Sequence, residues 1–70
     1  MVESITVTIN GRPEQVARDL TVARLLDHLG LTGQPLVIEK NLSVVLKSEW
    51  AAAGINAGDR IEFIRVVAGG

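Results

Sequence analysis

Apolar and polar residues alternate at the start of the chain. Over Ser4–Ile9, isoleucine and valine alternate with serine and threonine, which is the period-two pattern of a strand with one buried face. Asn10-Gly11 follows and favours a type I′ hairpin turn, because both turn positions need positive φ. A second strand is therefore expected from about Arg12 to Ala17. Pro13 should leave one side of that strand unpaired, since proline has no N–H to donate.

The spacing then becomes helical. Val22, Leu25, Leu26 and Leu29 recur at intervals of three and four residues, which places them on one stripe of a helix. Thr21 is a suitable N-cap, and Gly30 suits the left-handed position after the last turn. The pattern predicts an amphipathic helix from Thr21 to Gly30.

The second half of the chain predicts three more strands. Leu36–Lys40 and Ser43–Leu46 are expected to pair around Asn41-Leu42, a weaker turn because Leu42 resists positive φ. Ser48 is expected to cap one helical turn. After a turn at Ala57-Gly58-Asp59, a last strand should run from Arg60 to Val67. Both of its phases contain apolar residues, which is typical of a central strand.

This order of elements predicts an α+β fold of the β-grasp, ubiquitin-like type, with a mixed sheet of about five strands and one main helix on one face. Residues 1–70 should form a single domain, with 67–70 as a flexible C-terminal tail ending in Gly-Gly. The expected core consists of the apolar residues in phase with one face of each element: Ile5, Val7, Ile9, Leu25, Leu26, Leu29, Ile38, Ile61 and Phe63.

Composition excludes several classes of function. The 70 residues carry a net charge of −1 and no cysteine, so disulfide and thiolate chemistry are absent and there is no basic surface for nucleic acid. No apolar run approaches the ~20 residues of a membrane span. His28 has no second histidine or cysteine nearby, and we interpret it as a solvated residue at the helix end. We expect a cytoplasmic protein without a metal or cofactor of its own and without a catalytic set, hence not an enzyme.

The chain ends in Val67-Ala68-Gly69-Gly70. Glycine has no Cβ and lets backbone approach a ligand or a narrow channel closely. Such an end is suited to placing the Gly70 α-carboxylate in the active site of another protein, with Val67, Ala68 and Gly69 as the recognised tail.

These features together resemble the ThiS-type sulfur carriers of thiamine biosynthesis over essentially the full length. The resemblance rests on the Ile9-Asn10-Gly11 hairpin, the helix, Leu36–Asn41, Ser48–Ala51, Ala57–Glu62 and the Gly-Gly end. Asn41-Leu42 departs from the family, which more often turns there with glycine or a polar residue.

The resemblance implies a carrier on which other enzymes act. An adenylating enzyme of the ThiF type would activate Gly70 with ATP, and a sulfur donor such as a cysteine desulfurase would convert the adenylate to a thiocarboxylate. A thiazole synthase of the ThiG type would receive the sulfur. Alternatives are the small subunit of molybdopterin synthase or another thiocarboxylate carrier, a ubiquitin-like conjugating modifier, and a plain β-grasp interaction module.

One helix covers one face of a sheet, so the other face is available to partners. Ile64 and Val66 fall in the opposite phase to Ile61 and Phe63. Apolar residues grouped on an exposed face often mark an interaction site. Ile64 and Val66 are therefore the predicted docking face for the adenylating enzyme and the sulfur acceptor.

Overall fold

The first hairpin forms as the alternation predicts. In the computed structural model, which describes residues 3–67, β1 (Ser4–Ile9) pairs antiparallel with β2 (Arg12–Ala17). Asn10 and Gly11 have φ values of 49° and 82°, the positive values of a type I′ turn. β2 is an edge strand of the sheet. Pro13 is paired with Thr8 in a non-hydrogen-bonded position, so its nitrogen points to the free edge and β1 loses no donor.

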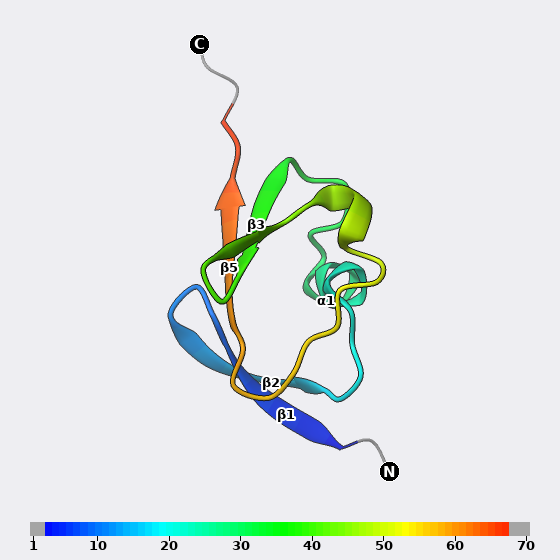
Figure 1. Ribbon diagram of the computed structural model, residues 1–70, viewed down its shortest axis with the longest axis vertical. Helices are drawn as coiled ribbons and strands as arrows, with labels where there is room; N and C mark the ends of the chain where they lie inside the picture. The colour runs from blue at the N-terminus through cyan, green and yellow to red at the C-terminus, as the bar shows by residue number, and fades with distance from the viewer. Residues whose placement is uncertain (1–2, 68–70) are drawn as a thin grey trace.

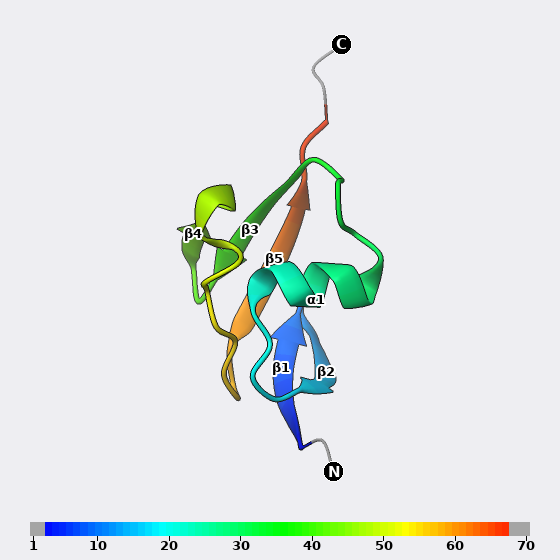
Figure 2. The same cartoon turned by 90° about the vertical axis from the view of Figure 1, so that its right-hand side faces the viewer.

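Three more strands complete a mixed sheet with one α-helix on one face. β3 (Leu36–Lys40), β4 (Ser43–Val45) and β5 (Arg60–Arg65) join the first hairpin in the order β2-β1-β5-β3-β4 (Figure 1). β5 is parallel to β1 and antiparallel to β3. Helix α1 (Val22–Leu29) crosses one face of this sheet (Figure 2). The predicted five-stranded mixed sheet with β5 at its centre is confirmed.

The predicted helix ends are also confirmed. The Thr21 hydroxyl accepts a hydrogen bond from the Arg24 N–H (3.3 Å). Gly30 has φ of 70°, and the Leu31 N–H donates to the Leu26 carbonyl (2.9 Å). This 6→1 bond is the signature of a Schellman motif, which satisfies carbonyls at the end of the helix.

The last strand is shorter than predicted. β5 ends at Arg65, opposite Leu36, and not at Val67. The Val66 N–H still donates to the Pro35 carbonyl (2.9 Å), but Pro35 has no N–H to return the bond. The ladder therefore stops where its neighbouring strand begins.

The predicted cap at Ser48 is wrong. Ser48 lies inside a 3₁₀ turn, η1 (Lys47–Glu49), and β4 ends at Val45. The Glu49 carboxylate accepts a hydrogen bond from the Leu46 N–H (3.0 Å). The turn thus begins at Leu46, two residues earlier than predicted, and the Glu49 side chain reaches back to bond the backbone N–H there.

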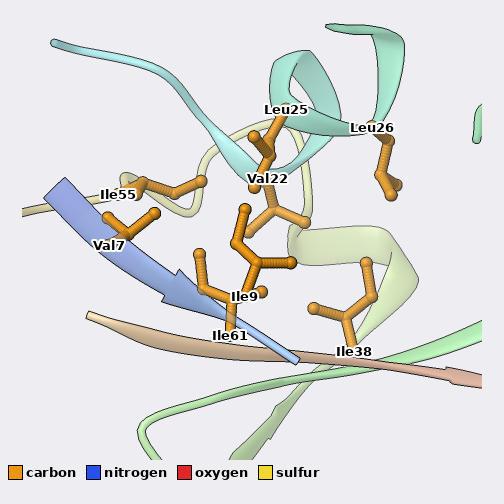
Figure 3. Close-up of a cluster of buried hydrophobic side chains, with 8 residues drawn as sticks. All are labelled: Val7, Ile9, Val22, Leu25, Leu26, Ile38, Ile55 and Ile61. Carbon is orange, nitrogen blue, oxygen red and sulfur yellow. The ribbon is translucent and has the colours of Figure 1, made fainter. Parts of the chain in front are cut away.

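The core lies between α1 and the sheet and is closed at one end by the segment before β5. Its eight buried residues are Val7, Ile9, Val22, Leu25, Leu26, Ile38, Ile55 and Ile61 (Figure 3). Six of the nine predicted core residues are among them. Ile5 and Phe63 pack against this cluster but are only half-buried. Their predicted position is confirmed, whereas full burial is not.

Leu29 is the wrong core prediction, with 42% of its surface exposed. It lines a shallow groove with Val16 and Ala17 of β2, and β2 is the last strand on that side of the sheet. The final turn of α1 therefore lies over the edge of the sheet, where no further strand covers the apolar stripe of the helix.

Two asparagines extend the hydrogen-bonding ladders of β5. Asn10 and Asn41 are the first residues of the two hairpin turns, with φ of 49° and 53°. The Asn10 N–H donates to the Ile61 carbonyl (2.9 Å), and the Asn41 N–H donates to the Arg60 carbonyl (2.7 Å). The side-chain Oδ1 of Asn10 accepts the Phe63 N–H (2.8 Å), and that of Asn41 accepts the Arg60 N–H (2.9 Å). Each carboxamide replaces a backbone carbonyl that the turn has rotated away.

This arrangement explains how the second turn forms with Leu42 at φ of 72°. The left-handed conformation costs a branched residue roughly 1–2 kcal/mol. Asn41 is fixed from outside the hairpin, because its Nδ2 also donates to Asp59 Oδ1 (3.0 Å). Asp59, only 8% exposed, accepts the Asn56 N–H as well (2.8 Å). Tertiary hydrogen bonds therefore impose the conformation that the local sequence opposes.

We predict that Asn10→Ala lowers the free energy of unfolding by about 2 kcal/mol, the sum of a lost hydrogen bond and an alanine in the left-handed region. Asn10→Asp keeps an acceptor oxygen and should lose much less. Asn41→Asp should lose more than Asn10→Asp, because it removes the amide donor and places a carboxylate against Asp59. Urea denaturation at neutral pH measures all three. Equal losses in Asn10→Ala and Asn10→Asp would show that the side-chain acceptor is unimportant.

Leu26→Ala should cost ~2–5 kcal/mol, the usual loss for a buried leucine. Leu29→Ala is the matched control on the same helical stripe, and its loss should be clearly smaller because Leu29 is 42% exposed against 3% for Leu26. Chemical denaturation of both variants distinguishes the observed core from the predicted one. Similar losses would mean that Leu29 belongs to the core.

Candidate functional site

The predicted modification site follows the end of β5. Ala68, Gly69 and Gly70 lie outside the described residues. Val67, the last described residue, is 80% exposed. The final recorded contacts before it are the Val66 N–H to the Pro35 carbonyl (2.9 Å) and Arg65 Nη2 to Gln34 Oε1 (3.1 Å). The described chain thus leaves the sheet directly from its central strand and continues beyond the sheet's end (Figures 1 and 2).

The predicted docking residues lie on the sheet face opposite α1. Ile64 is 45% exposed and Val66 is 48% exposed. Ile64 is paired with Val37 of β3, so these two side chains lie next to each other on that face. Val44 of β4 points to the same side and is 56% exposed. We call this surface, made of Val37, Val44, Ile64, Val66 and the two glutamates described next, the outer face.

Two glutamates lie within the outer face. Glu39 and Glu62 are directly opposite each other on β3 and β5, both half-buried. Like charges in facing positions destabilise a sheet. The ion pairs recorded within residues 3–67 join Arg18 to Glu3 and Asp19, so neither Glu39 nor Glu62 has a basic partner there. The outer face is therefore apolar with a concentrated negative charge where β3 and β5 face each other.

Sequence reasoning found Ile64 and Val66 but missed the rest of the outer face. Val37 and Glu39 are in the opposite phase to the inward-facing Leu36 and Ile38, and this alternation could have assigned them to the outer face. The juxtaposition of Glu39 with Glu62 depends on the register between β3 and β5. The two strands are separated by residues 41–59, and no local signal in the sequence fixes their register.

The described residues offer little chemistry of their own. Within residues 3–67, no group of three or more histidine, cysteine, aspartate or glutamate side chains is placed to hold a metal ion. His28 is exposed in the last turn of α1, as interpreted from the sequence. α1, at eight residues, is far too short to cross a membrane, and no longer helix occurs between residues 3 and 67.

Comparison with known proteins decides the family. A model of the ThiS family matches residues 7–70, which include the Gly-Gly end. The chain belongs to the ThiS family. The sequence-based resemblance to ThiS-type sulfur carriers is confirmed.

Solved structures of ThiS agree in fold. The crystal structure of the thiamine biosynthesis protein ThiS from Geobacter metallireducens superposes with a TM-score of 0.84 at 30% identity, covering 94% of this chain and 100% of that one. The solution structure of a thiamine biosynthesis protein from the same organism gives a TM-score of 0.77 at 30% identity, covering 94% of this chain and 88% of the other. The predicted β-grasp fold is confirmed.

Two proteins that are related to this chain in sequence differ greatly from each other in length. Thiazole synthase of Paramagnetospirillum magneticum is 34% identical over 64 residues, which are 91% of this ThiS-family chain but only 20% of that protein. The chain thus spans about a fifth of the thiazole synthase that it matches. The uncharacterized protein ycf40 of Porphyra purpurea is 29% identical over 68 residues, covering 97% of this chain and 96% of that protein.

The facing glutamates generate a stability prediction. Glu62→Lys places opposite charges at the Glu39 pair and should raise the free energy of unfolding by about 0.5–1 kcal/mol. Glu14→Lys is the control, because it makes the same change of charge at a position that faces the uncharged Val7. Its effect on the free energy of unfolding should be smaller. Denaturation at low and high salt checks this, because the gain should shrink as salt screens the pair. A Glu62→Lys protein no more stable than Glu14→Lys would contradict the electrostatic interpretation.

Proposed function

We propose that this ThiS-family chain carries sulfur for the thiazole of thiamine as a thiocarboxylate on Gly70. An adenylating enzyme of the ThiF type activates the carboxylate with ATP, a cysteine desulfurase supplies the sulfur, and a thiazole synthase of the ThiG type receives it. The observation that supports this most is the ThiS family match extending through residue 70, at the end of a chain that leaves the sheet from β5. The alternatives of a molybdopterin synthase subunit and a conjugating modifier have no comparable support.

The chemistry explains why the chain needs partners. The α-carboxylate has a pKa near 3.3–3.7 in general, so at neutral pH it is an anion and a poor electrophile. Attack of this carboxylate on the α-phosphorus of ATP expels pyrophosphate and leaves an acyl-adenylate. A persulfide sulfur then attacks the acyl carbon and expels AMP. Cleavage of the resulting S–S bond by a thiol, which is oxidised to a disulfide, leaves the thiocarboxylate on Gly70.

The chain's own contribution is to present the reacting carbon. Gly69 and Gly70 place no side chain beside it, so the backbone can enter an occluded site where the partner supplies the stabilising groups. Since the sulfur is held on the carboxyl carbon, a chain with no cysteine can still transport it. The proposed role is therefore that of a protein co-substrate rather than an enzyme.

The thiazole synthase partner is supported by the relative in which a ThiS-like stretch makes up a fifth of a thiazole synthase. A carrier stretch within that protein keeps the two at high effective concentration. We propose that separate chains meet through the outer face, with Ile64 and Val66 as apolar contacts and the pair Glu39–Glu62 selecting a basic residue on the partner. Opposite charges across such an interface steer association and exclude wrong partners.

Deleting Gly70 should nearly abolish adenylation. The deletion moves the carboxylate back by about 3.3–3.6 Å of extended chain, and a misplacement of ~1 Å can already cost about a hundredfold in rate. Gly69→Val should also fail, because a branched side chain obstructs a close-fitting channel. Thermal stability should hardly change in either variant. ATP–pyrophosphate exchange with the adenylating enzyme and mass detection of the thiocarboxylate are the assays, and full activity without Gly70 would end this proposal.

Ile64→Asp should weaken binding to the adenylating enzyme and to thiazole synthase while the fold is retained. Leu29→Asp is the matched control, because Leu29 is exposed to a similar extent (42% against 45%) and lies on the helix side of the molecule. Isothermal titration with each partner, together with circular dichroism of both variants, provides the measurement. If Ile64→Asp binds as tightly as Leu29→Asp, the outer face is not the docking surface.

A further inference from the structure

A second surface lies at the opposite edge of the sheet from β2, where β4 has no outer neighbour. In the two-residue hairpin, Lys40 and Ser43 form the closing hydrogen-bonded pair, so the next pair, Glu39 and Val44, is non-hydrogen-bonded. The Val44 N–H and carbonyl therefore point away from β3, to the free edge. Within residues 3–67, neither group has a recorded hydrogen-bond partner. β4 can thus accept one more strand.

A groove of about 440 Å³ is lined by residues of the β3–β4 hairpin, of η1 and of the segment that follows η1. Small side chains, including Ser43, Ser48 and Ala52, contribute to its lining together with Val44. Lining side chains of this size leave room for the backbone of an extended segment. β4 spans three residues, or roughly 10 Å at about 3.4 Å per residue, so the groove accommodates a segment of three to four residues.

The two ends of the groove differ in charge. Lys40, beside Ser43, is half-buried and its Nζ donates to the Gly54 carbonyl (2.9 Å). It takes part in neither of the ion pairs recorded for residues 3–67. Glu49 lines the other end, where its Oε1 accepts the Leu46 N–H. An antiparallel strand added to β4 runs from the Leu46 end to the Ser43 end, so its C-terminus lies at the Ser43 end, which is the end of the groove that Lys40 lines.

These observations favour a short segment that binds as a strand and ends in a carboxylate. Residues 67–70 have this length, and in the proposed function Gly70 has the carboxylate. Lys40 lies opposite Ile61, about 20 Å back along the sheet from Val67 at roughly 3.3 Å per residue. Residues 68–70 span at most ~11 Å, so a chain's own tail falls short of its own groove.

We propose that the C-terminal segment of one copy binds as an added antiparallel strand in the β4 groove of a second copy, with its carboxylate against Lys40. This contact is head-to-tail, and it pairs two molecules by mutual exchange or links them into short chains. While this contact lasts, the Gly70 carboxylate is not accessible to other enzymes. The interaction stands apart from the outer face and from the sulfur chemistry, so it holds or fails independently of the proposed function.

The test titrates ¹⁵N-labelled protein with the peptide Val-Val-Ala-Gly-Gly, once with a free C-terminal carboxylate and once as the C-terminal amide. The free acid should shift the amide resonances of residues 43–46 and 52–54, and the amide form should bind at least tenfold more weakly. Lys40→Gln should reduce binding of the acid to the level of the amide. Lys47→Gln, which changes a lysine that does not line the groove, should leave it unchanged.

Dilution of the full chain gives a second readout that needs no variant of the groove. Resonances of residues 43–46 should move with protein concentration between micromolar and millimolar, and deletion of Gly69-Gly70 should remove this dependence. The proposal is overturned if millimolar peptide causes no shifts, if acid and amide bind alike, or if the shifts map to Val37 and Ile64 instead. Loss of Gly70 adenylation has no bearing on these results, which distinguishes the two proposals.

Discussion

The hydrogen bonds that two asparagine side chains accept from N–H groups of β5 are the constraint on which the rest of this structure depends. β5 lies between β1 and β3, and each of those neighbours ends in a turn that rotates its backbone away from the central strand. Asn10 and Asn41 replace the missing carbonyls with their Oδ1 atoms at 2.8 and 2.9 Å. Asparagine suits both positions because it tolerates the left-handed conformation and has an acceptor of the right reach.

This constraint fixes the register of β5 against both hairpins, and the register determines what each face presents. With Ile61 and Phe63 directed to α1, Glu62 and Ile64 are directed outward, where Glu62 meets Glu39 and Ile64 meets Val37. A slip of one residue would exchange the two sets. Burial of Ile61 and exposure of the proposed docking residues are therefore two consequences of one alignment, and the chain leaves the sheet at a defined place.

The structure also retains features that lower its stability. Leu42 occupies a left-handed position with 83% of its surface exposed, and Glu39 faces Glu62. Each costs a small domain free energy, since total stabilities are typically only about 5–15 kcal/mol. Such costs often accompany surfaces used in binding. Glu39 and Glu62 lie on the outer face, and Leu42 lies in the turn that leads into β4.

The sequence by itself determined the elements and their order. Alternation in Ser4–Ile9, the helical stripe from Val22 and the Asn10-Gly11 turn are local signals, because each depends on residues within a few positions of one another. The same local reasoning predicted an exposed apolar pair at Ile64 and Val66 and identified the Gly-Gly end. The phase of the apolar residues within each strand and the helix also predicted most of the core.

Only the tertiary structure decided what depends on contacts between distant segments. Ile55 is buried without any periodic signal, since it lies in an irregular segment whose N–H donates to the Leu20 carbonyl (2.9 Å). Leu29 continues the helical stripe yet is exposed, because the sheet ends beneath it. Leu42 adopts a turn that its own side chain disfavours, because Asn41 is held by Asp59 and Arg60. In each case the packing or hydrogen bonding of segments far apart in sequence outweighed the local preference.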